Sequence, residues 1–149
     1  MKTKVITLLL VIVLGLSACG SGSEFQRNQN KWQAQDVNHY RFTIAVSCFC
    51  PFASVEVTYE VLNGQVVNQS VQTSPDNPVD EAQVSEFYQP YNTIEKVFDY
   101  VGKAVDEADK TTIEYNPTYG FPIDVSVDRN ELATDDELYL TISNFESLQ

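Results

Sequence analysis

Apolar and polar residues alternate along six segments of this chain. In the first, residues 38–50, every second side chain is apolar: Tyr40, Phe42, Ile44 and Val46. The same alternation recurs over five further segments: 54–62, 65–73, 111–117, 121–127 and 137–145. Because successive side chains of a strand point to opposite faces, each segment predicts a strand with one apolar and one polar face.

One segment has helical spacing. Thr93 is a predicted N-cap, and it precedes an apolar stripe with a period of three to four residues: Ile94, Val97, Phe98, Val101, Val105 and Ala108. Residues 25–36 are a weaker helix candidate, in which Trp32 is expected to anchor the edge of the core. Residues 74–92 contain three prolines and predict a long loop with at most one helical turn.

The order of these elements predicts an α+β fold with the order βββ-α-βββ. A sheet with one apolar face needs one layer packed on that face, and the apolar stripe of the helix can supply it. We therefore expect a mostly antiparallel sheet of about six strands, with its polar face in solvent. Asn63-Gly64 predicts a type I′ hairpin that places Val61 opposite Val66.

The N-terminus predicts export and membrane attachment. Lys2 and Lys4 precede an apolar run over residues 5–16, which is too short to span a bilayer and is typical of a signal peptide. The following Leu16-Ser17-Ala18-Cys19 resembles the lipobox of bacterial lipoproteins, which implies cleavage before Cys19 and lipidation of that cysteine.

This interpretation divides the chain into three parts. Residues 1–18 would be the signal peptide, 19–30 the lipidated cysteine with a flexible tether, and 31–149 a single globular domain. The expected location is the cell envelope: the outer membrane in a host with two membranes, which Gly20 favours, and otherwise the outer face of the cytoplasmic membrane.

The chain is strongly acidic, with a formal net charge of −12. Loss of Lys2 and Lys4 with the signal peptide would make the mature chain more acidic still. Such a charge excludes nucleic acid as an expected partner and would attract cationic proteins or divalent cations. The simpler interpretation is that it keeps an exported protein soluble.

Lipidation of Cys19 would leave two of the three cysteines free, Cys48 and Cys50. Both continue the core-facing side of the first strand. Residues two apart on an ideal strand have Cα atoms about 6.6 Å apart, which is near the upper limit of about 6.8 Å for a disulfide. A disulfide is the favoured interpretation and requires a bend before Pro51; buried thiols and a redox or metal role are the alternatives.

The sequence offers no clear catalytic, cofactor or metal-binding residues. The one histidine, His39, would lie roughly 30 Å from Cys48 along an extended strand, which excludes a cysteine–histidine pair within that strand. The acidic segment 128–137 departs from the calcium-binding EF-hand pattern and is interpreted as a solvated turn. Tyr115, Tyr119 and Phe121 could form an exposed patch for a partner, although packing over the end of the sheet is favoured.

Several short motifs resemble a family of small exported bacterial proteins that is known only as a domain of unknown function. They occur in this order: Trp32, Tyr40-Arg41-Phe42, Ser47-Cys48-Phe49-Cys50, Thr93-Ile94, Tyr119-Gly120-Phe121-Pro122 and Asp135-Asp136-Glu137-Leu138. The resemblance covers residues 30–145. It implies a secreted or lipid-anchored protein and supplies no catalytic residues.

These observations favour a non-enzymatic envelope lipoprotein that is attached to the membrane through Cys19 and that binds an unidentified protein or supports an assembly. Charge and size motivate one alternative, an acidic inhibitor of a cationic enzyme such as a lysozyme. The other alternative is an envelope thiol–disulfide protein that uses Cys48 and Cys50.

Overall fold

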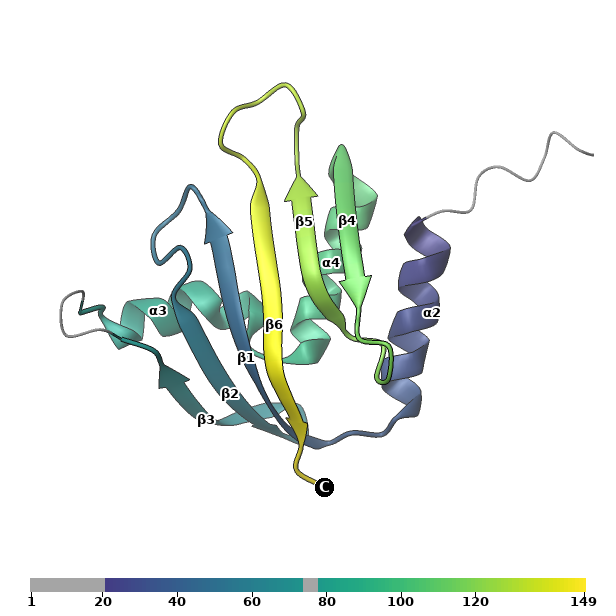
Figure 1. Cartoon of the computed structure of the whole chain (residues 1–149), viewed down its shortest axis with the longest axis vertical. Coiled ribbons are helices and arrows are strands. Elements are labelled where there is room, and N and C mark those ends of the chain that lie inside the picture. Colours follow the sequence, from purple (N-terminus) through teal and green to yellow (C-terminus); the bar gives the residue numbers. More distant parts are fainter. Residues whose placement is uncertain (1–20, 74–77) are drawn as a thin grey trace, which may run out of the picture.

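The computed structural model describes residues 21–73 and 78–149 (Figure 1). The expected signal peptide and Cys19 lie outside these residues. The elements follow in the order α2 (Ser21–Ala34), β1 (His39–Cys48), β2 (Glu56–Leu62), β3 (Gln65–Val71), α3 (Glu81–Tyr88), the 3-10 helix η2 (Gln89–Tyr91), α4 (Ile94–Glu107), β4 (Lys110–Tyr115), β5 (Pro122–Asp128) and β6 (Leu138–Ser147).

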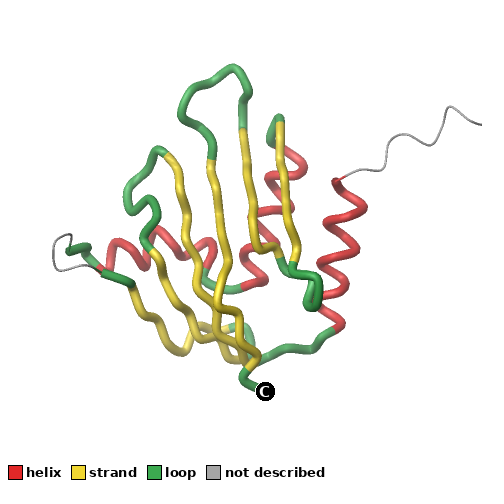
Figure 2. Tube along the Cα trace, viewed as in Figure 1, coloured by secondary structure: helices red, strands yellow, loops and turns green. Residues whose placement is uncertain are grey.

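The six strands form one antiparallel sheet in the order β3-β2-β1-β6-β5-β4. Each half of the chain contributes a three-stranded meander, and the two meanders join where β1 pairs with β6. The predicted α+β fold and its βββ-α-βββ order are confirmed. Helices α3 and α4 both lie behind the sheet in the view of Figure 1, and α2 lies beside β4. None of the helices in the described part of the chain lies on the front face of the sheet (Figure 2).

The core lies between the sheet and its helices. The four apolar residues predicted on the inner face of β1 are completely buried. Helix α4 packs behind β4 and β5 with the predicted stripe, in which Ile94, Val97, Phe98 and Val101 are buried. The Thr93 side chain accepts a hydrogen bond from the backbone N–H of Lys96, which confirms the predicted N-cap.

Two local backbone features set the register of the sheet. Asn63 and Gly64 have φ angles of 51° and 73°, and Val61 pairs with Val66, as the predicted hairpin requires. In β6, Asn144 has a φ of 51° and forms a bulge, because β6 has two residues where β1 has one. The bulge turns Phe145 toward the core, although alternation from Ile142 would have placed it in solvent.

The helix candidate over residues 25–36 corresponds to helix α2, which begins at Ser21, so the described part of the segment expected as a tether, residues 21–30, is helical. Trp32 is 4% exposed, and its indole N–H donates to Glu95 at 3.1 Å. The Tyr40 hydroxyl donates to the same carboxylate at 2.8 Å and accepts from the N–H of Ile94 at 3.0 Å. Burial and the Glu95 charge raise the pKa of Tyr40 far above its usual value, so the hydroxyl stays protonated. This one carboxylate therefore joins α2, β1 and the start of α4.

Gly102 disfavours the helix that contains it, but it allows α2 to pack closely against α4. A Cβ atom built at this position would lie 3.1 Å from the ring of Phe25 on α2. That ring also packs edge-on against Phe98, with centroids 5.9 Å apart. The glycine therefore gives Phe25 room against α4.

The prediction of a loop over residues 74–92 is wrong for its second half, which forms α3 and η2. Asp80 caps α3 by accepting from the N–H of Ala82 at 2.9 Å, and Val84 and Tyr88 are buried one turn apart. The prolines lie outside α3, so they do not interrupt it. Two buried positions give too short an apolar stripe for periodicity to reveal. No helix in the described part of the chain has the length and apolarity to cross a bilayer.

Candidate functional site

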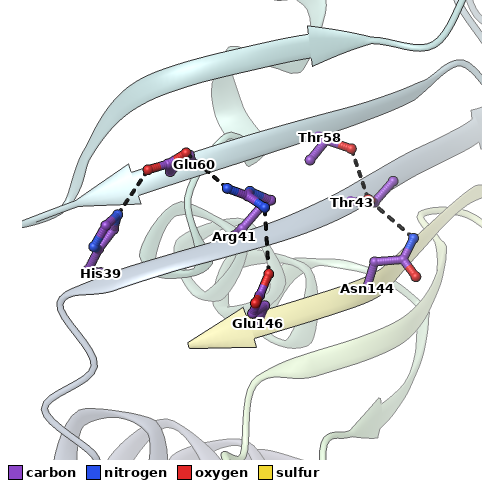
Figure 3. Close-up of polar contacts among 7 residues, drawn as sticks. All are labelled: His39, Arg41, Thr43, Thr58, Glu60, Asn144 and Glu146. Carbon is purple, nitrogen blue, oxygen red and sulfur yellow. Dashed lines mark hydrogen bonds and ion pairs between the residues drawn. The ribbon is translucent and has the colours of Figure 1, made fainter. Parts of the chain in front are cut away.

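The front face of the sheet, opposite α3 and α4, carries a row of polar contacts across β2, β1 and β6 (Figure 3). His39 Nε2 lies 3.0 Å from Glu60 Oε1, and Arg41 lies 3.3 Å from Glu60 and 3.5 Å from Glu146. Farther along, Thr43 bonds to Thr58 at 2.9 Å. Hydrogen bonds from His39 and Arg41 hold the pKa of Glu60 below its usual value.

This network is suited to register and solubility. Arg41 lies directly opposite Glu60 on β2 and Glu146 on β6, so the ion pairs follow the strand pairing. Among the described residues, the His39 ring bonds to Glu60, not to a hydroxyl or thiol that it could activate. His39 and Cys48 lie at opposite ends of β1, which agrees with the exclusion of a cysteine–histidine pair within the strand.

The exposed aromatic patch considered for Tyr115, Tyr119 and Phe121 does not form. Phe121 is completely buried, and both tyrosines are half-buried against the core. The ring of Phe121 lies 5.7 Å from that of Trp32, centroid to centroid. The rings close the end of the core beneath α2, which is the favoured interpretation from the sequence. Burial raises the pKa of Tyr115 to about 12.

Cys48 and Cys50 lie in direct contact at the end of β1, with their Cα atoms 5.1 Å apart. The chain bends immediately after Cys48, as the sequence required for a contact between these side chains. The bend forces the intervening Phe49 outward, where 86% of its surface is exposed. The other seven phenylalanines are buried or half-buried.

A second exposed apolar residue lies on the neighbouring loop. Cys48 pairs with Leu138, so the loop after β1 and the loop before β6 leave the same end of the sheet (Figure 1). We call these two loops, residues 49–55 and 129–137, the cysteine end. Leu132 lies in the longer loop and is 95% exposed. The cysteine end thus presents one aromatic and one aliphatic side chain to solvent.

A cavity of about 200 Å³ opens beside the two cysteines. Its lining combines apolar residues with a mainly acidic rim: Cys48, Phe49, Cys50, Phe87, Tyr91, Arg129, Asp135, Asp136, Glu137 and Leu138. Burial raises the pKa of Tyr91 to about 12, so its hydroxyl is neutral at physiological pH. In the described ranges, no three His, Cys, Asp or Glu side chains form a group that could hold a metal ion.

The loop after β1 is held in an unusual backbone conformation. Phe52 and Ser54 both have a φ of 62°, which costs a non-glycine residue roughly 1–2 kcal/mol. Tyr88 supports the loop from below: its hydroxyl accepts from the N–H of Val46 at 3.0 Å and donates to the carbonyl of Val55. The Phe52 ring packs edge-on against Phe87. Two side chains of α3, Phe87 and Tyr88, therefore fix the loop that displays Phe49.

Sequence reasoning found the two cysteines but missed the surface around them. Leu132 lies in a turn that was considered only for its carboxylates, and Phe49 was considered only as a spacer between cysteines. Neither residue breaks a periodic pattern. Their common location follows from the pairing of β1 with β6, two strands about 90 residues apart in the chain.

Comparisons with known proteins add a family to this geometry. A family model described as a family of unknown function, DUF6174, matches residues 24–147. The match begins within α2 and ends in β6, so it covers nearly all of the described domain. Searches of curated proteins and of solved structures found no match.

Proposed function

This chain belongs to the DUF6174 family of unknown function, and we propose that it is a non-enzymatic protein-binding domain that is anchored to the cell envelope and binds its partner at the cysteine end. The observation that carries this proposal is the joint exposure of Phe49 and Leu132 at one end of the sheet. A single exposed apolar residue is ordinary in a soluble protein. Two of them, on adjacent loops beside a cavity, are typical of an interaction surface.

The way Phe49 is held strengthens this interpretation. A hot-spot side chain contributes most to binding when it is already ordered, because less conformational entropy is lost on association. The Cys48–Cys50 contact closes a ring around Phe49, and Tyr88 fixes the backbone on either side of the loop. Strained backbone at Phe52 and Ser54 is also a feature that gathers at functional sites.

The double variant F49S/L132S tests the proposal. We expect it to lower the amount of partner that co-purifies with the full chain after chemical crosslinking in native host cells by at least about tenfold, which corresponds to roughly 1.4 kcal/mol. The matched control is L62S/V67S, because Leu62 and Val67 are exposed apolar residues near the opposite end of the sheet. Equal losses in the two double variants would contradict the proposal.

The surroundings of the cysteines support a structural disulfide over a redox centre. A reactive cysteine needs an electropositive environment that stabilises its thiolate. Here Asp135, Asp136 and Glu137 line the cavity beside Cys48 and Cys50, against a single Arg129. Such carboxylates disfavour a thiolate, so we propose that the two cysteines form a stable disulfide in the mature protein.

The proposed anchor is a lipid on Cys19. The Leu16-Ser17-Ala18-Cys19 motif supports it, and two or more acyl chains would hold the domain stably at a membrane. With helix α2 beginning at Ser21, Cys19 would lie two residues from the folded domain. Such an anchor would hold the domain close to the membrane surface.

Replacing Cys19 with alanine is expected to abolish incorporation of a labelled fatty acid and to move the protein out of the membrane fraction. S21A is the control, since it keeps the cysteine and changes one residue of the same segment. Both variants are labelled in cells with a palmitate analogue and fractionated. A C19A protein that still carries label would show that the anchor lies elsewhere.

A further inference from the structure

We infer that the edge of the sheet at β4 binds an extended, positively charged segment of a second protein, which adds a further strand between β4 and helix α2. We call this site the α2–β4 groove; it is lined by Glu24, Asn28, Lys31 and residues 111–117. None of these residues belongs to the cysteine end, so the inference goes beyond the proposed function. It follows from the free edge of β4, the shape of the groove and the charge of its walls.

Strand β4 is the last in the strand order, so it pairs with β5 on one side only. The N–H of Asp109 donates to the carbonyl of Arg129, its partner in the continued register. Because the direction of bonding alternates along an antiparallel strand, the N–H and C=O groups of Thr112 and Glu114 face away from β5. Among the described residues, none forms a hydrogen bond with these outward groups. The edge therefore offers the backbone groups that an added strand requires.

Two adjoining cavities of about 400 and 240 Å³ form the groove along this edge, and α2 lies beside β4 (Figure 1). Both cavities are lined by Glu24 of α2 and by Ile113 and Tyr115 of β4. The smaller cavity is also lined by Thr111 and Thr112, which directly precede Ile113. Consecutive side chains of a strand point to opposite faces, so a cavity lined by three in a row follows the edge of the sheet.

Helix α2 determines what can reach this edge. Two sheets that pair edge to edge extend away from each other in one plane, and α2 occupies that position beside β4 (Figure 1). The helix is held there at both ends: the Lys31 ammonium donates to the Pro117 carbonyl, and the Phe25 ring packs against Phe98 of α4. A second copy of the domain would therefore collide with α2, whereas a single extended segment needs only the groove.

The charge of the groove selects a basic segment. Glu114 lies directly opposite Asp124 of β5, and both side chains are exposed. Like charges in register repel each other, and within the described ranges neither residue forms an ion pair. Glu24 is exposed on the opposite wall, while Lys31 is directed to Pro117. Lysine or arginine in the added strand would complement these carboxylates.

A short labelled peptide that alternates threonine with lysine probes the groove, because threonine favours strands and lysine supplies the charge. Binding to the full chain in neutral detergent is followed by fluorescence anisotropy. One control peptide carries a methyl group on every backbone nitrogen, which keeps the charge and removes the N–H donors. The other replaces lysine with glutamate. We expect both control peptides to bind at least about tenfold more weakly.

The variant T112P removes the outward N–H of Thr112, which takes no part in the pairing with β5, so the sheet should persist. We expect it to weaken the lysine peptide by at least about tenfold. T112A is the matched control, since it keeps the N–H and should change the affinity less than about twofold. In the parent chain, the peptide should shift the amide NMR signals of Thr112 and Glu114 and leave those of β3 unchanged.

Four results would each overturn the inference: no binding of the lysine peptide, equal binding of the methylated peptide, equal effects of T112P and T112A, and shifts in β3 instead of β4. Shifts of the Thr112 and Glu114 amides that depend on protein concentration without peptide would place a second copy in the groove, which also contradicts it. The F49S/L132S comparison does not involve the α2–β4 groove, so the proposed function stands or falls separately.

Discussion

Replacing Gly120 with alanine is expected to lower the free energy of unfolding by about 2–4 kcal/mol, because two penalties coincide at this position. Gly120 has a φ of 87°, which residues with a Cβ rarely adopt. A Cβ atom would also lie 2.7 Å from the backbone carbonyl oxygen of Asn28 and 3.0 Å from the Cβ of Lys31. Both contacts are with α2, so the turn and the helix would have to separate.

Gly64 provides the matched control, since it has a similar φ of 73° and open space around it. G64A should therefore incur only the backbone penalty, roughly 1 kcal/mol. Denaturant unfolding of both variants, followed by circular dichroism, separates the two terms. If G120A is no less stable than G64A, the close approach of α2 to the turn over residues 116–121 is wrong.

Replacing Tyr88 with phenylalanine is expected to cost about 1.5–3 kcal/mol, because the change leaves two backbone groups without their partner. The Tyr88 hydroxyl lies between the N–H of Val46 and the carbonyl of Val55, where β1 and β2 separate. Without it, the amide of Val46 remains in a buried strand with no acceptor. Hydrogen exchange should show faster exchange at Val46 and in the loop over residues 49–55.

Tyr59 offers a control with the same chemical change. Its hydroxyl is also buried, but it has no hydrogen-bond partner among the described residues. Y59F should therefore leave stability within about 1 kcal/mol of the parent or raise it, because no bond is lost and a buried polar group is removed. A loss in Y59F as large as that in Y88F would show that packing, not the bridging hydroxyl, explains the result.

The strands and the main helix could be predicted from the sequence because each buries one face against a single layer. Alternation along β1 and the stripe of α4 report that burial directly. Helix α3 could not be found in this way, since only Val84 and Tyr88 of its eight residues are fully buried. Its start was nevertheless visible in Asp80, three residues before a glutamine, which is the spacing of a capping box.

The candidate site was harder to predict than the fold. Cys48 and Cys50 are two residues apart, and a local argument was sufficient to bring them together. The neighbouring surface depends on which strands pair, and alternation within a strand carries no information about its neighbours. Packing of Phe121 over the end of the sheet was expected, but its contact with Trp32 of α2 depends in the same way on how distant segments meet.

The central claim is that the partner contacts the cysteine end, and crosslinking from two leucines tests it most directly. A photoreactive amino acid replaces either Leu132 in the cysteine end or Leu62 at the opposite end of the sheet, both of which are exposed. The full chain is then irradiated in cells of the native host. We predict a crosslinked partner from position 132 and none from position 62. Crosslinking of the same partner from position 62, with none from position 132, would contradict the account.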